Sequence, residues 1–494
     1  MYVLGYDIGS SSVKASLVNV ESGKCAASAF FPKTEAPILA VKQGWAEQDP
    51  QSWWDNLKLA TQAVLTASGA KAEEIKAIGI SYQMHGLVCV DKNQQVLRPS
   101  IIWCDSRAVP YGQKAFQTLG EAQCLSHLLN SPGNFTASKL AWVKENEPEN
   151  FAKICKIMLP KDYLAYCLTG VHCCDYSDAS GMLLLDVKNK CWSEQMMEIC
   201  GVSREQMPEL FESYEKVGTL KPEVAKELGL PETCLVAAGA GDNAAAAVGT
   251  GTVGDGQCNV SLGTSGTIFI SSENFGVDPH NALHAFAHAD GHYHLMGCML
   301  SAASCNKWWM DTIIGTKDYE KEQEAIEKLG ENHVFFLPYL MGERSPHNDP
   351  QARGTFIGMS MDTTRADMTQ AVLEGVAFAI RDSFEVAKSL GIHIERTRIC
   401  GGGAKSPLWR KIIANVLNIK VDRIVSEEGP ALGGAMLAAV ADGTFASVEE
   451  AAARIVKVVE TVEPDPEIAE KYETQYRKFV QIYPTVKALF PKLS

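Results

Sequence analysis

The stretch that decides the fold lies at the N-terminus, where residues 2–20 read YVLGYDIGSSSVKASLVNV. Its apolar runs at 2–6 and 13–20 are typical of β-strands, and the small polar residues from 7 to 12 are typical of a turn. The stretch therefore predicts a β-hairpin whose tip carries one acid, Asp7, beside a run of glycine and serine.

A second copy of this pattern lies near the middle of the chain, where residues 259–271 read NVSLGTSGTIFIS. Aligning 7–11 with 261–265 places the same strand, turn and strand in the same order, about half the chain length apart. A single repeat at this distance predicts two related domains and not a solenoid. Only the first copy keeps the acid.

The rest of the chain alternates patterns typical of strands and helices, which predicts an α/β fold. Strands are expected at 75–81, 234–240, 335–340 and 398–403, and helices at 137–146, 161–168, 365–390 and 408–417. The Gly/Thr-rich segment 249–256 predicts a hinge. It divides the chain into an N-terminal domain, 1–248, and a C-terminal domain, 249–494.

Composition excludes several classes of protein. The 494 residues, 46% apolar and 21% charged, are typical of a globular chain, and the net charge of −14 disfavours a nucleic-acid partner. No apolar stretch approaches the roughly 20 residues that span a bilayer, so no membrane segment is expected. Fifteen cysteines without a CxxC pair indicate reduced thiols and a cytoplasmic location.

Phosphate binding is the first chemistry that the motifs suggest. The GxxxxGK[ST] pattern is absent, and the glycines at 249, 251 and 254 lack the strand that should precede a dinucleotide-binding turn. Glycine-rich turns at 9–12, 263–266 and 401–406 can each direct backbone N–H groups at an anion, although each alone is also consistent with a plain tight turn. A carboxylate such as Asp7 beside phosphates implies a bridging divalent cation, Mg²⁺.

A second acid stands where an apolar strand breaks, in residues 239–246, GAGDNAAA. Asp242 is expected to cap the helix that follows, where amide donors and the helix dipole favour its ionised form. An ionised carboxylate close to phosphates is also what a general base for a substrate hydroxyl requires. The two roles are compatible.

Five histidines, at 280, 284, 288, 292 and 294, gather after the second hairpin. The residues 289–291, ADG, predict a turn between strands that alternate at period two. Because cysteines or carboxylates at ligand spacing are missing, no metal site is expected there.

The ordered set of motifs resembles the FGGY carbohydrate kinases over nearly the whole chain. The resemblance is carried by DIGSSSVK at 7–14, GGGAKSPLW at 401–409 and PALGG at 430–434. It implies two actin/hexokinase-like (ribonuclease H-like) domains that flank a catalytic cleft.

The resemblance also implies roles for individual residues. Asp242 is the expected catalytic base, and Asp7 is expected beside Mg²⁺ and the transferring phosphoryl group. The residues expected to hold ATP are Ser10, Ser11, Lys14, Gly263, Thr264, Gly402, Gly403 and Ala404.

Sugar selection is expected from the motifs QMHG at 83–86, WCDSR at 103–107 and GERSP at 342–346. The predicted sugar-binding residues are Met84, His85, Trp103, Asp105 and Asn243. A histidine after a buried strand is more often structural, but the carboxyl end of a strand in an α/β fold favours a ligand role for His85. Arg107 is expected to orient Asp105. The stretch NFTASKLAW at 134–142 resembles a family signature but begins with Asn where a small or aromatic residue is expected, so no sugar contact is assigned to Asn134.

The implied activity is ATP-dependent phosphorylation of the primary hydroxyl of D-xylulose to D-xylulose 5-phosphate, a step in pentose catabolism. Another FGGY kinase acting on ribulose, a different ketose or gluconate is the alternative, because the sugar pocket decides within a shared fold. A different-class alternative is an actin- or chaperone-like ATPase that phosphorylates no sugar. The expected partners are therefore a small sugar and ATP, and a homodimer is left open.

Overall fold

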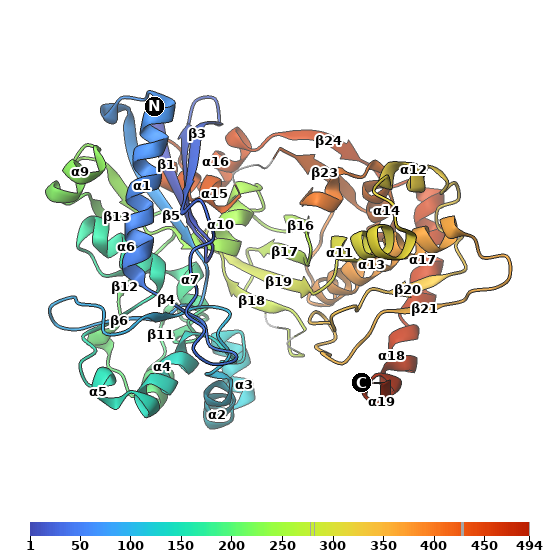
Figure 1. The fold of residues 1–494 in the computed structure, drawn as a ribbon, viewed down its shortest axis with the longest axis horizontal. Helices are drawn as coiled ribbons and strands as arrows, with labels where there is room; N and C mark the ends of the chain where they lie inside the picture. The colour runs from blue at the N-terminus through green and yellow to red at the C-terminus, as the bar shows by residue number, and fades with distance from the viewer. Residues whose placement is uncertain (277, 281, 426–428, 494) are drawn as a thin grey trace.

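The computed structural model describes residues 1–276, 278–280, 282–425 and 429–493 as an α/β chain with two large mixed sheets. Figure 1 shows the two sheets in separate lobes, the N-terminal half in blue and green and most of the C-terminal half in yellow to red. The polypeptide is therefore organised around two sheets, as the repeated hairpin predicts.

The first sheet has the strand order β13-β14-β5-β1-β2-β3. Its strands are β1 (Tyr2–Ile8), β2 (Val13–Asn19), β3 (Lys24–Phe31), β5 (Ile75–Tyr82), β13 (Lys216–Thr219) and β14 (Leu235–Ala237). β1 runs antiparallel to β2 and parallel to β5, and β5 runs parallel to β14. The short β15 (Ala240–Gly241) continues alongside β5.

The second sheet repeats this pairing. Its strands are β16 (Cys258–Leu262), β17 (Gly266–Ser272), β19 (Tyr293–Met299), β22 (Arg396–Cys400), β23 (Lys420–Ile424) and β24 (Val458–Val462), with β18 (His284–Ala287) added at one edge. β16 runs antiparallel to β17 and parallel to β22, and β22 runs parallel to β23. β16 and β22 thus occupy the places of β1 and β5, and this shared topology confirms the internal duplication.

Helices pack around both sheets. The larger ones of the N-terminal half are α1 (Pro50–Ser68), α2 (Val109–Leu119), α4 (Thr136–Asn146), α6 (Pro160–Thr169), α8 (Glu194–Cys200), α9 (Pro222–Leu228) and α10 (Asp242–Gly249), and the short α7 (Tyr176–Ser180) follows β9 (Cys173–Asp175). In the C-terminal half they are α13 (Arg365–Ser389), α14 (Pro407–Leu417), α15 (Pro430–Ala441), α16 (Val448–Ile455) and α17 (Pro466–Phe479), with the short α11 (Ala303–Lys307) and α12 (Tyr319–Glu324).

Local sequence explains where these helices begin. The side chains of Asp49 and Ser406 accept hydrogen bonds from the first-turn N–H groups of α1 and α14, and Pro occupies the first position of both helices. Thr364 and Asp367 form a reciprocal capping box at the start of α13. The predicted helices at 137–146, 161–168, 365–390 and 408–417 are confirmed within two residues at each end.

The predicted strands are confirmed less completely. The expected strand 234–240 is interrupted, because Gly239 adopts a φ of +75° between β14 and β15. The expected strand 398–403 ends at Cys400, since Gly401 has a φ of +87° and residues 402–405 form a 3₁₀ turn. The strand expected at 335–340 is only β20 (Phe335–Leu337), and Asp7, expected in a turn, lies inside β1.

Helix α15 joins the two halves of the sequence. It packs against β1, β5 and α10. Met436 of α15 and Ala451 of α16 belong to the same core cluster as Val3 and Ala77 of the first sheet. A Cβ on Gly433 would lie 1.8 Å from the carbonyl oxygen of Ala245, so only glycine permits this approach of α15 to α10.

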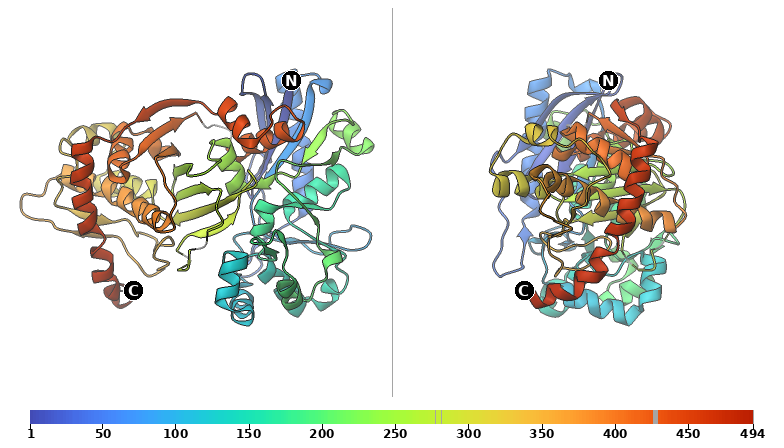
Figure 2. Two further views of the ribbon diagram at one scale, coloured as in Figure 1. Left: turned by 180° about the vertical axis from the view of Figure 1, so that it is seen from behind. Right: turned by 90° about the vertical axis from the view of Figure 1, so that its right-hand side faces the viewer.

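This packing differs from a simple division of the chain at the predicted hinge. Although α15 and α16 belong to the C-terminal half of the sequence, they lie beside the first sheet in both views of the lobes (Figures 1 and 2). The chain therefore passes between the sheets at 249–256, and the segment 430–455 of the C-terminal half lies against the first sheet.

Candidate active site

Asp7 and Asp242 are brought to the same end of the first sheet. In the register of the strands, Asp7 of β1 pairs with Ser81 of β5, and Ala240 of β15 pairs with the same Ser81 from the other side. Asp242 then begins α10 directly after β15. The N-cap residue is Gly241 and not Asp242 as expected, so the acid is the first helical residue, and its Oδ1 accepts the first-turn N–H of Asn243.

Both carboxyl groups are held out of their ordinary ionisation range. Burial raises the pKa of Asp242 to about 7, with the charge of Asp7 adding to the effect and the Asn243 N–H, 2.7 Å from Oδ1, opposing it. Burial likewise raises the pKa of Asp7 to about 6, opposed by the Ser81 hydroxyl and the Lys14 charge. Two acids whose charges are poorly compensated can accept a proton and attract a cation.

The turn after β1 forms a cavity of about 470 Å³ beside Asp7. It is lined by Asp7, Gly9, Ser10, Ser11, Ser12, Lys14 and Phe30. Gln48 holds this turn in place, because its Nε2 donates to the Ser10 carbonyl at 2.7 Å and its Oε1 accepts from Gln83 Nε2 at 3.3 Å. The predicted phosphate-binding residues Ser10, Ser11 and Lys14 therefore line one cavity. Gln48, which belongs to none of the motifs, connects this turn to Gln83, the first residue of the motif QMHG at 83–86.

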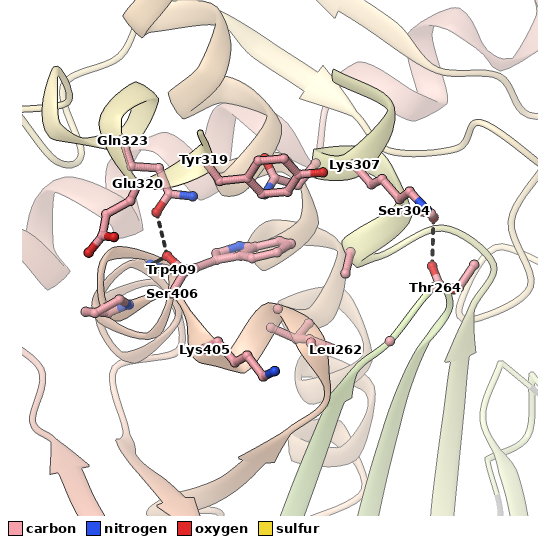
Figure 3. Close-up of a pocket in the computed structure, with 16 residues that line it drawn as sticks. Leu262, Thr264, Ser304, Lys307, Tyr319, Glu320, Gln323, Lys405, Ser406 and Trp409 are labelled. Carbon is pink, nitrogen blue, oxygen red and sulfur yellow. Dashed lines mark hydrogen bonds between the residues drawn. The ribbon is translucent and has the colours of Figure 1, made fainter. Parts of the chain in front are cut away.

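A larger cavity of about 760 Å³ lies in the second lobe (Figure 3). Of the residues predicted to hold ATP, Gly263, Thr264, Gly402 and Gly403 line it. The Ser304 hydroxyl donates to the Thr264 carbonyl at 2.7 Å, and the Ser406 hydroxyl donates to Gln323 Oε1 at 2.6 Å. Lys405, Ser406 and Trp409 of the motif at 401–409 also line it, and the wall is completed by residues that no motif indicated: Ser304, Asn306, Lys307, Tyr319, Glu320 and Gln323.

The base of this cavity explains the glycine run. A Cβ on Gly403 would lie 2.9 Å from the ring of Trp409, which is buried and donates from Nε1 to the Leu373 carbonyl at 3.0 Å. Ala404 is also buried, and it is not among the residues that line the cavity. Its carbonyl accepts from Arg410 at 2.6 Å, so Ala404 supports the turn from behind.

The loop that follows β5 carries Met84 and His85. His85 has a φ of +71°, unusual for a residue with a side chain, and its ring packs edge-on against Phe135 with centroids 4.2 Å apart. Burial lowers the pKa of His85 to about 3, so the ring is neutral at physiological pH. Because Nδ1 lies 2.9 Å from the Gly181 carbonyl, Nδ1 carries the proton and Nε2 is an acceptor.

Met84 connects this loop to the paired acids. Asn243 Nδ2 donates to the Met84 sulfur at 3.7 Å, and a Cβ on Gly241 would lie 2.9 Å from Met84 Cγ. Met84, Asn243 and Asp242 are therefore neighbours in the structure, and their role in binding a sugar stays a prediction.

Asp105 is placed differently from the expectation of a free diol-binding carboxylate. It is fully buried, accepts the Ala46 N–H at 2.6 Å and is bound by Arg107 through Nε and Nη2 at 2.6–3.0 Å. Arg107 thus orients Asp105 as predicted, but both carboxylate oxygens are already bonded. Trp103 is 52% exposed, and Asn134 donates from Nδ2 to the Asp105 carbonyl.

Two further buried groups carried no signal that we recognised in the sequence. Lys139 is fully buried, and its Nζ donates to the His85 carbonyl at 2.6 Å. Asp178 of α7 is fully buried beneath Gly241, and neither carboxylate oxygen has a hydrogen-bond partner. Only the three-dimensional packing of α4 and α7 against the loop after β5 places them near the site.

The histidine-rich segment forms the predicted hairpin, with β18 and β19 joined at 288–292. Within the described residues, His292 lies near Asp290 and Glu449, with ligand atoms within 4.8 Å of one another. Both oxygens of Asp290 accept backbone N–H groups, from Gly254 and His292, which gives this acid a structural role in the turn.

The two duplicated sheets, with an acid pair at the end of one and a large cavity in the other, define a phosphotransferase of the carbohydrate-kinase class. The chain belongs to the FGGY family of carbohydrate kinases: the family's N-terminal domain matches residues 2–249 and its C-terminal domain matches residues 258–441. It is therefore a sugar kinase of a family that uses ATP and a divalent metal. This membership excludes the alternative of an ATPase without a sugar substrate.

Comparison with individual proteins shows similarity to xylulose kinases. The chain is 40% identical to a xylulose kinase of Escherichia coli strain K12 and 36% identical to one of Bacillus subtilis strain 168, with at least 98% of each chain covered. It superposes on a crystal structure of a xyloylose kinase from Brucella ovis with a TM-score of 0.90 at 37% identity, covering 99% of this chain and 100% of the other.

A gluconate kinase from Lactobacillus acidophilus superposes equally well, with a TM-score of 0.90 at 26% identity, covering 100% of this chain and 99% of the other. The shared fold therefore does not by itself select the sugar. In the part of the chain that the structure describes, no helix is long and apolar enough to cross a membrane.

Proposed function

We propose that this kinase transfers the γ-phosphoryl group of ATP to the primary hydroxyl of D-xylulose, giving D-xylulose 5-phosphate. The observation that carries the proposal is the wall formed by Asp242, Asn243 and Met84, which joins a poorly compensated acid to a surface suited to a small polyol. Identity of 36–40% with named xylulose kinases over nearly the whole chain supports this choice of sugar.

Asp242 acts as the general base in this proposal. Its carboxylate accepts the proton of the attacking hydroxyl, and a pKa of about 7 makes it a competent acceptor near neutral pH. His85, neutral and with Nε2 as an acceptor, takes a hydrogen bond from a sugar hydroxyl, while Met84 contacts the carbon skeleton.

Asp7 fits a hard cation, because its carboxylate is buried and, among the described residues, accepts one long hydrogen bond, from the Ser81 hydroxyl at 3.4 Å. We propose Mg²⁺, which would be held by Asp7 and, when bound, supplies neutralisation of phosphate charge. The N–H groups and hydroxyls of Ser10 and Ser11, with Lys14, would bind the phosphates from the same cavity.

The nucleotide occupies the second lobe in this proposal, in the 760 Å³ cavity behind Gly263 and Gly403. Residues 1–248 then supply the sugar pocket and base, and residues 249–494 supply the nucleotide site. Transfer requires the two lobes to approach, and closure would also exclude water as a competing acceptor.

A sugar panel tests the choice of substrate. Release of ADP, measured by a coupled assay with Mg²⁺, should give the highest kcat/KM for D-xylulose among D-xylulose, ribulose, other ketoses and gluconate. Phosphorus NMR of the product should place the phosphate on the primary hydroxyl. A higher kcat/KM for gluconate or another ketose would overturn the assignment of D-xylulose while leaving the kinase class intact.

We further propose a cytoplasmic location, supported by fifteen cysteines that are all free thiols. A homodimer remains open, and light scattering of the purified chain decides it.

A further inference from the structure

Lys139 is an unusual residue in the interior of the first lobe. It lies in the first turn of α4 with no exposed surface, and among the described residues its Nζ donates one hydrogen bond, to the main-chain carbonyl of His85 at 2.6 Å. Lysine is among the residues least often buried, because its ammonium group loses hydration that one hydrogen bond does not replace. The burial of Lys139 therefore costs stability, which a functional role would offset.

The residue that Lys139 holds is strained. With a φ of +71°, His85 lies in the left-handed region that residues with side chains occupy only when their surroundings impose it. Three contacts impose it here: the bond from Lys139 to the carbonyl, the bond from Nδ1 to the Gly181 carbonyl, and the edge-on packing of Phe135. The first acts on the backbone and the other two act on the ring.

A buried network of charged side chains lies near Lys139 and acts on its charge. Arg98 and Arg107 bind three acids, Glu47, Glu147 and Asp105, so the five side chains carry one excess negative charge. Asp105 is the nearest acid that favours the charged form of Lys139, while burial lowers the pKa of Lys139 to about 7. Lys139 therefore interacts with the charge of this network and, through its hydrogen bond, with the His85 backbone.

We propose that Lys139 is a positioning residue of the sugar site, which fixes the backbone of His85 so that the ring presents Nε2 to a hydroxyl of the substrate. This inference rests on the proposed sugar pocket. The side chain of Lys139 contacts no reacting group in it. Removing Lys139 frees the His85 peptide to leave the left-handed region, which moves the ring acceptor, and sugar binding weakens without a change at the nucleotide cavity.

A double-mutant cycle tests this coupling. K139M, H85A and the double variant are compared with the parent chain for the KM of D-xylulose, the KM of ATP and kcat. We expect K139M to raise the sugar KM about tenfold, the size typical of losing a hydrogen bond to a charged group, with the ATP KM unchanged. In the H85A background, K139M should add less than twofold, because both changes remove the same interaction.

Two controls separate this role from a merely structural one. K144M changes an exposed lysine on the same helix and should leave the sugar KM at the parent value. Because K139M removes a positive charge near a network in which acids are in excess and leaves the His85 carbonyl without its donor, its melting temperature should fall, and the kinetics are measured well below that temperature so that the variant is folded in the assay. K139Q, a polar side chain too short to reach the carbonyl, provides a second variant and should show the same sugar KM defect.

The outcomes distinguish a failure of the inference about Lys139 from a failure of the proposed sugar pocket. If K139M and K139Q both keep the parent sugar KM, or if the effects of K139M and H85A multiply in the double variant, Lys139 does not act through His85 and the inference is overturned. If instead H85A alone leaves the sugar KM unchanged, the proposed sugar pocket itself is wrong.

Discussion

Replacing Asp242 by asparagine is the sharpest test of the paired acids. The amide preserves the size of the side chain at the start of α10 and next to Met84, but it cannot accept a proton from the sugar. Loss of a general base typically lowers kcat by about 10²–10⁴-fold. Because the side chain keeps its shape, nucleotide binding should remain at the parent level.

The pKa of Asp242 gives a second, independent signature. Only the ionised carboxylate can act as a base, so kcat/KM of the parent chain should fall about tenfold per pH unit below about 7, where Asp242 becomes protonated. In D242N the residual activity should lack this acidic limb. Removing the charge of Asp7 should move the limb to lower pH, because that charge contributes to the raised pKa of Asp242.

Stability should change in the opposite direction to activity. A carboxyl whose pKa rises from 3.8 in the unfolded chain to about 7 in the folded protein binds its proton more tightly when folded. The charged form then opposes folding, by up to about 4 kcal/mol above pH 7 and by nothing below pH 4. D242N should therefore be more stable than the parent chain at pH 8, and the difference should vanish at pH 4.

The assay combines coupled ADP release between pH 5.5 and 9 with urea unfolding at pH 4 and pH 8. Calorimetric titration of a nonhydrolysable ATP analogue serves as the control for folding and nucleotide binding. Retention of more than a tenth of the parent kcat by D242N, with an unchanged acidic limb, would refute the assignment of Asp242 as the base.

Three further predictions concern the cation, the packing of α15 and the nucleotide cavity. Asp7→Ala should raise the Mg²⁺ concentration for half-maximal activity at least about tenfold in a metal titration, and an unchanged titration would make Asp7 a strand residue only. Gly433→Ala should destabilise the protein despite a helix-propensity gain of about 1 kcal/mol, because its Cβ would lie 1.8 Å from the Ala245 carbonyl; equal urea midpoints would contradict this. Gly403→Ala should raise the KM of ATP by displacing the Trp409 ring, which lies 2.9 Å from the added carbon, while the sugar KM stays constant.

Much of the fold could be predicted because it follows from local patterns. The hairpin of β1 and β2 and its copy in β16 and β17 alternate apolar runs with glycine-rich turns, and this is enough to indicate two related sheets. The packing of α15 on the first sheet could not be predicted this way. Its sequence is apolar on all sides, so periodicity does not indicate which sheet it covers. The glycines that permit its close approach lie on four separate elements, with Gly5 on β1, Gly79 on β5, Gly249 on α10 and Gly433 on α15 itself.

The site shows the same division between local and non-local signals. Asp7 lies at the carboxyl end of β1, and Asp242, His85 and the glycine turns come within a few residues of a strand end, so strand ends indicate them. Tyr319 and Gln323 of α12 line the nucleotide cavity as well, and no short motif indicates them. Asp105 was predicted as a sugar ligand from its motif, but its own neighbour Arg107 occupies the carboxylate.

Asp105 differs from Asp7 and Asp242 in how many hydrogen-bond partners its carboxylate has within the protein. This difference distinguishes a structural acid from functional ones. Asp105 is fully buried, and its bonds to Arg107 and Ala46 satisfy both oxygens within the protein. Burial instead raises the pKa of both Asp7 and Asp242, with the charge of Asp7 adding to the effect at Asp242. Among the described residues, the hydrogen bonds to these two carboxylates are one from the Ser81 hydroxyl at 3.4 Å and one from the adjacent Asn243 N–H at 2.7 Å. A protein gains nothing in stability from such a pair, so we infer that its partners are supplied by the reactants: a cation and phosphates for Asp7, and a hydroxyl proton for Asp242.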